Sequence, residues 1–227
     1  AMDVLCTDKT GTLTEAKISL DRHVDILGGD SAHVLELAYL NSAFETGLKS
    51  PLDEAVLAHD RLDAGRWKKI DEVPFDFERR RVSVLLDDGA TRMLVVKGAP
   101  EDVLALTTEY EANDVGSVRA WDAAAREKAH GQLESLETQG MRALGIAFKQ
   151  VARDCDHVAV SDEAQLVFAG FAAFLDPPKK SAAKALAALV AGGIAVKILT
   201  GDSAAVTQHI CEKLGVPVTG VLTGDAL

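Results

Sequence analysis

The two ends of this chain share a pattern that constrains the fold more than any other feature. A short apolar run, Val4–Thr7, stops at a charged loop that contains glycine, Asp8–Gly11. After residue 165 the same kind of strand returns, alternating with helices: Phe171–Leu175, Lys179–Ala191, Ile194–Leu199 and Ser203–Leu214. Strands and helices that alternate at this spacing are typical of a parallel α/β domain. We therefore expect one α/β domain built from residues 1–14 and 172–227, with a second domain, 15–171, inserted into it.

The central stretch reads as α+β with an antiparallel sheet. Val82, Val84 and Leu86 alternate before an Asp-Asp-Gly turn that leads into Met93–Lys97, which predicts a hairpin. Pro100 suits the first turn of a helix. Other expected elements are helices at Ser31–Thr46, Leu52–Leu62 and Ser117–Leu136, and a strand at Leu144–Phe148.

Composition excludes several classes. With 24 basic and 35 acidic residues, the net charge of −11 argues against a general nucleic-acid binder. The longest apolar runs, Leu166–Leu175 and Ala185–Val196, are well short of the roughly 20 residues that a bilayer requires. The three cysteines lack metal-site or disulfide spacing. Asp3 and Asp8 interrupt the start of the chain, so no signal peptide is expected. We expect a soluble, cytosolic and monomeric chain.

Ligands collect at the carboxyl ends of parallel strands, where two loops of this sequence belong. Asp8 follows the first strand directly, and a carboxylate can accept a phosphoryl group as an acyl phosphate. Hydroxyl and N–H groups of the following Thr-Gly-Thr run suit phosphate oxygens, as do those of Thr200 and Gly201 at a helix start. The alternative is that Asp8 caps a turn and Thr200–Asp202 is only a capping loop.

The run Asp8-Lys9-Thr10-Gly11-Thr12-Leu13-Thr14 resembles the phosphorylation motif of P-type ATPases. Further segments resemble other motifs of that family: Thr200–Asp202 its second phosphate loop, Asp176–Pro178 its hinge, Lys97–Glu101 its nucleotide-pocket lysine motif, and Val73–Arg81 its adenine-stacking segment. Thr46–Lys49 and the Phe-Asp-Phe-Glu-Arg-Arg-Arg run are most similar to bacterial magnesium importers. The resemblance implies a haloacid-dehalogenase-like phosphorylation domain, incomplete here, interrupted by a nucleotide-binding domain.

The resemblance also implies ligands and site residues. ATP and Mg²⁺ are the expected cofactors, with Asp8 and the Thr10 carbonyl on the metal. Catalysis is assigned to Asp8, Lys9, Thr10, Thr200, Gly201 and Asp202, and nucleotide binding to Phe75, Lys97, Gly98, Arg142 and Asp53.

Three of the nucleotide-binding assignments have a plainer alternative. Phe75 would stack on adenine unless it is a core residue, a role for which Phe77 is the better candidate. Lys97 would reach toward the charge of ATP, unless it is a surface lysine at a strand end. Arg142 would approach the phosphates, unless it is a strand-edge charge. The Arg79–Arg81 run either is a solvated hairpin face or raises the local potential for ATP.

One position separates two enzyme classes. Soluble phosphatases of this fold place an acid two residues after the nucleophile to activate water. Thr10 stands there instead, so the acyl phosphate should be long-lived, as a transport cycle requires. We expect the catalytic part of an ATP-driven cation pump at the cytoplasmic face of a membrane, with magnesium import as its function. The cation-carrying spans would lie outside these residues, and the isolated chain should bind ATP with little turnover. A soluble phosphatase is the alternative.

Overall fold

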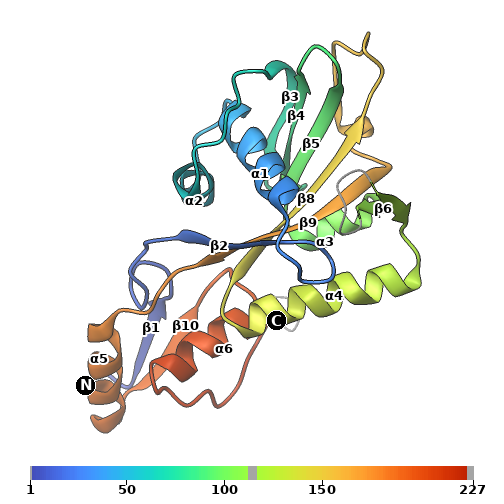
Figure 1. Cartoon of the computed structure of the whole chain (residues 1–227). Coiled ribbons are helices and arrows are strands. Elements are labelled where there is room, and N and C mark those ends of the chain that lie inside the picture. Colours follow the sequence, from blue (N-terminus) through green and yellow to red (C-terminus); the bar gives the residue numbers. More distant parts are fainter. Residues whose placement is uncertain (1, 112–116, 224–227) are drawn as a thin grey trace. The chain divides into compact units, whose positions relative to one another are not determined.

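The computed structural model describes residues 2–111 and 117–223 (Figure 1). The chain divides into two compact units. The smaller unit draws on both ends of the chain, up to Ile18 and from Leu175 onward, and on Glu134–Arg142. The larger unit consists of Ser19–Leu133 and Ala143–Phe174.

The smaller unit contains two parallel strands, β1 (Val4–Asp8) and β10 (Ala195–Leu199), with Asp8 paired to Leu199. Two helices, α5 (Lys180–Ala191) and α6 (Ala204–Lys213), accompany them. Helix α6 begins where the Ser203 hydroxyl accepts the Val206 N–H. Leucine and isoleucine side chains of both helices bury a small core together with Leu13. The expected helix–strand–helix order after residue 179 is therefore present, and β10 is parallel to the N-terminal strand.

The larger unit is built on an eight-stranded sheet in the order β3-β4-β5-β8-β9-β6-β7, with β2 beside β9. Its strands are β2 (Ser19–Val24), β3 (Lys68–Asp76), β4 (Arg81–Asp87), β5 (Arg92–Gly98), β6 (Thr107–Glu111), β7 (Val118–Ala120), β8 (Arg142–Gln150) and β9 (Leu166–Leu175). Neighbours from β3 through β5 to β8 are antiparallel, but β6 runs parallel to β9. The sheet is mixed, which corrects the expectation of an antiparallel one.

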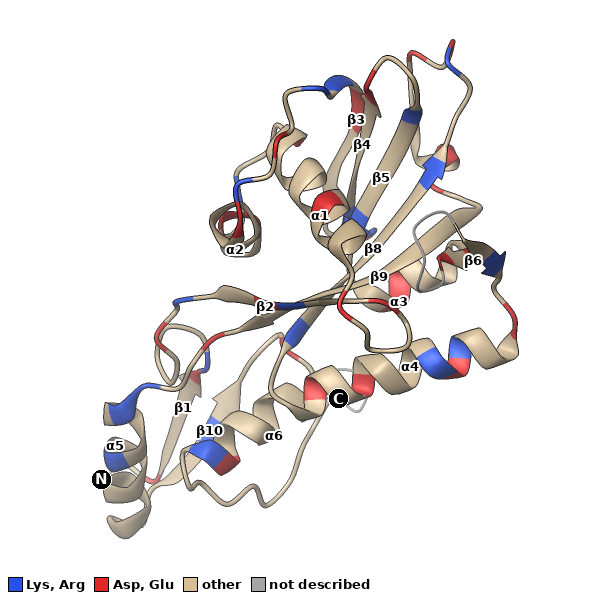
Figure 2. Ribbon diagram, viewed as in Figure 1, with Lys and Arg blue, Asp and Glu red and all other residues tan. Residues whose placement is uncertain are grey.

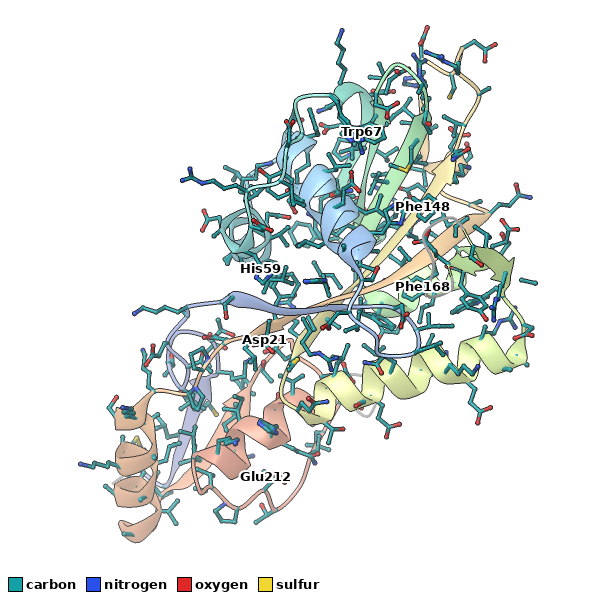
Figure 3. All side chains as sticks on the ribbon, in the orientation of Figure 1. Asp21, His59, Trp67, Phe148, Phe168 and Glu212 are labelled. Carbon is teal, nitrogen blue, oxygen red and sulfur yellow. The ribbon has the colours of Figure 1, made fainter. Side chains whose placement is uncertain are left out.

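Among the residues that the structure describes, four α-helices belong wholly or partly to this unit: α1 (Ala32–Phe44), α2 (Pro51–His59), α3 (Pro100–Ala105) and α4 (Ala123–Thr138). Helix α1 packs on the β4–β5 side of the sheet, where the Asn41 amide donates hydrogen bonds to the carbonyls of Val82 and Val95 (Figure 1). Aromatic rings pack together in the interior of this unit. The ring centroid of Phe168 lies 5.0 Å from that of Phe171 and 5.8 Å from that of Trp121. Figure 3 labels Phe168 among the side chains.

Two expected elements differ from the structure. The helix expected from Ser117 begins only at Ala123, because Val118–Ala120 pairs with β6 as a strand. The apolar run expected to open the second half of the parallel domain belongs instead to β9, which continues unbroken from Leu166 to Leu175 in the mixed sheet. Hydrophobicity alone could not assign that run to a sheet, since every residue of it but the last is buried.

Candidate functional site

The parallel register of the smaller unit brings the two predicted phosphate loops to the same edge. Because Asp8 pairs with Leu199, the loop after β1 and the loop after β10 leave the sheet side by side. Asp8 is exposed, and one of its carboxylate oxygens accepts the Lys9 N–H at 2.8 Å. Thr10, Thr200 and Gly201 are exposed as well. The arrangement leaves the Asp8 carboxylate and the two sets of predicted phosphate-binding groups open to a ligand.

The loop after Asp8 is held by its own backbone and by Thr14. The amides of Leu13 and Thr14 both donate to the Lys9 carbonyl, and Gly11 adopts a positive φ of 75°. The buried Thr14 hydroxyl donates to Asp176 at 2.5 Å and accepts the Gly11 N–H at 3.2 Å. The Thr14 hydroxyl, which lies outside the Thr-Gly-Thr run expected to contact phosphate, thus ties the loop to the Asp-Pro-Pro segment.

Lys9, Asp202 and Arg142 form a charged group beside Asp8. The Lys9 ammonium is buried and paired with the Asp202 carboxylate. Arg142 has a guanidinium nitrogen 3.8 Å from the same carboxylate, with 58% of its side chain exposed. The Asp202 N–H donates to the Thr200 hydroxyl at 3.1 Å. Arg142, which was expected among the nucleotide-binding residues, therefore contacts a residue of the second phosphate loop.

A second polar cluster lies in the larger unit around Lys97, which is only 5% exposed. Its ammonium donates to the Ser42 hydroxyl at 2.8 Å, is paired with the Asp53 carboxylate, and lies 3.7 Å from a Glu45 oxygen. Ser42 also donates to Asp53 at 2.9 Å. We call Ser42, Glu45, Asp53 and Lys97 the Lys97 cluster. It unites two predicted binding residues, Lys97 and Asp53, whose charges neutralise each other.

Asp53 is fixed from both sides of its carboxylate. The hydroxyl and the N–H of Ser50 donate to Oδ2 at 2.6 and 2.9 Å, and the Asp53 N–H donates back to that hydroxyl, which forms a capping box for α2. Burial by itself would raise the pKa of Asp53, but the Lys97 charge and the hydrogen bonds from Lys97 and Ser50 outweigh it and lower the pKa. Asp53 is thus held as a carboxylate.

The pKa of Glu45, the C-terminal cap residue of α1, is shifted in the opposite direction from that of Asp53. Burial raises the pKa of its carboxyl to about 7, and the neighbouring Asp53 charge adds to the increase, although Lys97 and Lys49 oppose it. No motif in the sequence pointed to Glu45 or Ser42 as site residues. The only signal was their place next to the Thr46–Lys49 segment.

Phe75 and Gly98 lie at the same end of the sheet as Lys97. The register runs from Asp76 through Arg81 to Gly98, so Phe75 on β3 and Lys97 on β5 lie at the same end with β4 between them. Phe75 is 53% exposed and meets Phe77 edge to face at 5.3 Å. Phe77 is 88% exposed, which makes the expectation that it is a core residue wrong.

Gly98 is required by packing against the adjacent strand. A Cβ at this position would lie 2.6 Å from the Arg80 carbonyl oxygen and closer still to the Arg81 side chain. The predicted role of leaving space for a ring remains a prediction, beside this separate structural reason for glycine.

The three arginines after Phe77 are all paired with carboxylates. Arg79 and Arg81 donate to the fully buried Glu163 at 2.7–2.8 Å, and Arg80 donates to Asp102 at 2.7 Å. Neither expectation fits, since the run is not simply solvated and its charges are largely compensated. Glu163 lies some 80 residues further along the chain, and no sequence signal connected it with the arginines. More widely, basic and acidic residues are interspersed on the elements of each unit (Figure 2).

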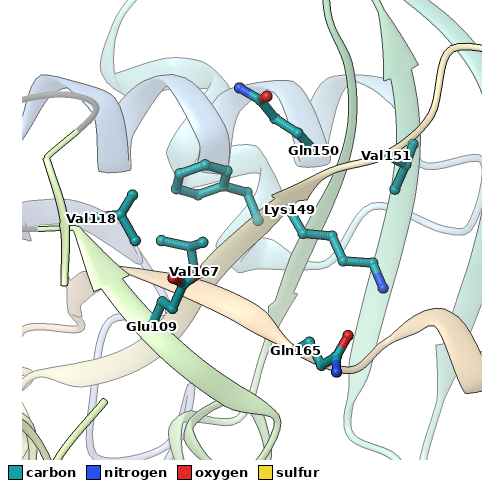
Figure 4. A pocket seen from close by; sticks show the side chains of 8 residues that line it. Glu109, Val118, Lys149, Gln150, Val151, Gln165 and Val167 are labelled. Carbon is teal, nitrogen blue, oxygen red and sulfur yellow. The ribbon is translucent and has the colours of Figure 1, made fainter. Parts of the chain in front are cut away.

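A separate hollow of about 540 Å³ lies where β8 ends and β9 begins (Figure 4). It is lined by Glu109, Val118, Phe148, Lys149, Gln150, Val151, Gln165 and Val167. It shares no residue with the Lys97 cluster or with the predicted site residues.

Neither a closed metal centre nor a membrane span occurs in the described parts of the chain. Within 2–111 and 117–223, no three His, Cys, Asp or Glu side chains gather closely enough to hold a metal ion. No helix in those ranges combines the length and apolar character needed to cross a bilayer.

Comparison with known proteins identifies the family that these loops and the mixed sheet define. Residues 40–181 match the family model described as P-type ATPase, cytoplasmic domain N. The chain belongs to the P-type ATPase family, as the resemblance of its motifs predicted.

Among its relatives are magnesium transporters. The chain is 46% identical over 232 residues to the magnesium-transporting ATPase, P-type 1, of Salmonella typhimurium (strain LT2), and equally so to that of Escherichia coli K12. It is 29% identical over 248 residues to calcium-transporting ATPase 1 of Lactococcus lactis. Each alignment covers 99% of this chain and 25%, 26% and 28% of the relative, in that order. The chain thus spans about a quarter of the length of these relatives.

Proposed function

We propose that this chain is the ATP-binding and phosphate-accepting part of a cation pump, with magnesium as the transported ion. The observation that carries the nucleotide assignment is the sheet end where half-exposed Phe75 lies at the level of the Lys97 cluster. The magnesium assignment rests on the relatives named above. We assign residues 15–171 to nucleotide binding, and 1–14 with 172–227 to a haloacid-dehalogenase-like phosphorylation domain.

The chemistry of the sheet end suits an adenine nucleotide. An open aromatic ring can stack on a base, a contact worth about 1–3 kcal/mol in single-strand binders. Lys97 is neutralised by Asp53, so in this state the pair offers hydrogen-bonding groups more than a net positive charge. We therefore assign the pair to hydrogen bonding with the nucleotide.

In the phosphorylation step, an Asp8 carboxylate oxygen would attack the γ-phosphorus. The bond from the γ-phosphorus to the β,γ-bridging oxygen breaks, and ADP leaves with the bond's electron pair. The Thr200 hydroxyl and the Gly201 N–H would hold the transferred group. Lys9 and Arg142 would add positive charge there, part of which the Asp202 carboxylate balances. Water later hydrolyses the acyl phosphate to regenerate Asp8.

The donors near Asp8 fit Mg²⁺ bound together with ATP better than a resident metal. Asp8 offers an exposed carboxylate and Thr10 a backbone carbonyl, and Mg²⁺ commonly takes one or two carboxylates plus phosphate oxygens and waters. The ion would neutralise charge on the phosphates. Thr10 in place of an acid disfavours a soluble phosphatase, because it cannot activate the hydrolytic water.

A calorimetric titration of Mg-ATP into this chain tests nucleotide binding. We expect saturable binding that Phe75→Ala weakens by about 1–3 kcal/mol and that Phe77→Ala weakens much less. Lys97→Met should also weaken binding, with circular dichroism verifying its fold. If the folded chain bound no nucleotide, or if both phenylalanine variants behaved alike, the assignment would be wrong.

Phosphoryl transfer is tested in the full-length protein. Incubation with ATP labelled at the γ-phosphate should yield an acid-stable, hydroxylamine-sensitive label that Asp8→Asn abolishes. A label that persisted in Asp8→Asn would exclude Asp8 as the acceptor.

A further inference from the structure

The last turn of α1 surrounds Lys97 with two side chains that the sequence did not single out. Ser42 and Glu45 are three residues apart, so they lie on one face of the helix. The Ser42 hydroxyl bridges Lys97 and Asp53, at 2.8 and 2.9 Å. The Glu45 carboxyl, 8% exposed, lies 3.7 Å from the Lys97 ammonium. The C-terminal end of α1 therefore supplies two polar side chains that contact the buried Lys97 ammonium.

The charges within this cluster do not balance when every acid is ionised. One ammonium faces two carboxyl groups, of which Asp53 holds the shorter contact and the capping-box hydrogen bonds. The groups that face Glu45 are Lys97 from β5, Asp53 from α2 and Lys49 from the loop between α1 and α2. Lys49 is also engaged by the carbonyls of Ser42 and Glu45 itself. An ionised Glu45 leaves one net negative charge among Glu45, Asp53 and Lys97, whereas a protonated one can donate to Asp53.

We propose that Glu45 is a positioning residue for Lys97, and that nucleotide binding is coupled to proton uptake by the Glu45 carboxyl. This inference rests on the proposed nucleotide site. With Glu45 protonated, Lys97 stays with Asp53 and Ser42, and the three charged side chains are neutral in sum. With Glu45 ionised, Lys97 is shared between two carboxylates and the cluster repels an anionic nucleotide.

The sign of the pH dependence follows from this coupling. The Glu45 carboxyl of the free chain has its pKa raised to about 7, chiefly by burial. A nearby nucleotide anion disfavours the ionised form, so the pKa in the complex is higher still. The complex then binds more protons than the free chain near and above pH 7, and affinity falls as pH rises through that range. A further increase of one unit corresponds to about a tenfold loss.

The test compares nucleotide affinity at pH 6 and pH 8.5 in the wild type, Glu45→Gln and Glu54→Gln. Glu54 is exposed on the first turn of α2 and serves as the matched control. Non-hydrolysable ATP analogue with Mg²⁺ is titrated calorimetrically in two buffers of different ionisation enthalpy, which reports proton uptake directly. We expect about three- to tenfold weaker binding at pH 8.5 for the wild type and for Glu54→Gln, and a much flatter profile for Glu45→Gln. The ATP analogue also changes its protonation between these pH values, but it does so equally for all three proteins, so the comparison among them is unaffected.

A second readout does not require nucleotide. The carbon-13 resonance of the Glu45 carboxyl, assigned by its loss in Glu45→Gln, should titrate near pH 7 in the free chain. Nucleotide binding with the same pH profile and proton uptake in Glu45→Gln as in wild type would overturn the inference while leaving the nucleotide site intact. A Glu45 resonance that titrates near its ordinary range would overturn it too. Absence of binding by all three proteins at both pH values would overturn the proposed function and this inference together.

Discussion

Glu163 lies at the centre of the buried ion-pair network that holds the strand end next to Phe75. Its carboxylate accepts two hydrogen bonds from Arg79, one from Arg81 and one from the Ser83 hydroxyl, at 2.5–2.8 Å. It comes from the segment between β8 and β9 and is 1% exposed. Glu163→Gln keeps the shape of the side chain but removes the charge and replaces one acceptor oxygen with a donor.

The expected loss follows from this geometry. Breaking a buried pair by removing one partner costs about 3–5 kcal/mol, because the remaining charge stays buried without compensation. Glutamine retains one acceptor oxygen and the arginines are partly exposed, so we expect the lower end, about 3 kcal/mol. With a urea dependence of about 2 kcal/mol per molar, the unfolding midpoint should fall by about 1.5 M.

Tryptophan fluorescence during urea unfolding reports the stability of the larger unit, to which Glu163 belongs. Trp67 and Trp121 are both buried and both belong to the larger unit. Glu101→Gln is the control, since Glu101 is 59% exposed and lies 4.0 Å from Arg80; such surface pairs contribute about 0–1 kcal/mol. If Glu163→Gln unfolded at the same midpoint as the control, the network would not be stabilising and the reasoning would be refuted.

Three further outcomes are expected. Gly98→Ala should destabilise the larger unit by about 1–3 kcal/mol, measured by the same unfolding, because its Cβ would meet the Arg80 carbonyl; unchanged stability would contradict the packing argument. Glu45→Gln should change how the free energy of unfolding depends on pH. In the wild type, the folded chain keeps the Glu45 proton up to about pH 7, whereas the unfolded chain loses it near pH 4.5, so the contribution of Glu45 to stability declines between these values. In the variant this decline should be smaller by about 1–3 kcal/mol. Thr14→Val should speed amide hydrogen exchange in the loop after β1, because Asp176 would lose the hydrogen bond that the Thr14 hydroxyl donates to its Oδ2. The other oxygen of Asp176, Oδ1, has no hydrogen-bond partner among the described residues. Exchange at the wild-type rate would show that the Thr14 hydroxyl does not hold the loop.

Local pattern was sufficient for much of the fold. The helix at 203–214, the hairpin after Val82 and the strand before Asp8 follow from hydrophobic period, turn residues and glycine, and all are present. The family followed from motifs that are contiguous in sequence, and the match over residues 40–181 confirmed it. The roles of individual site residues remain predictions.

The pattern of residues along the sequence could not predict which strands pair with each other or which charged side chains form ion pairs. The run Leu166–Leu175 is apolar whether it joins a parallel or a mixed sheet, and only the packed sheet pairs it with β6 and β2. Phe75 and Phe77 are alike in sequence context, yet Phe75 on β3 is 53% exposed and Phe77, just beyond the strand, is 88% exposed. Glu163 met the arginines through a contact that spans 80 residues or more.

The sequence by itself determined the family of this protein, and it predicted a split domain, an inserted domain and two phosphate loops. Those features depend on the order of residues along a few turns or strands, where chain connectivity fixes the geometry. The tertiary structure decided that Lys97 is buried among Ser42, Glu45 and Asp53, and that Glu45 has a pKa near neutrality. Burial and charge proximity are sums over neighbours from distant segments, and they exist only once the chain has packed.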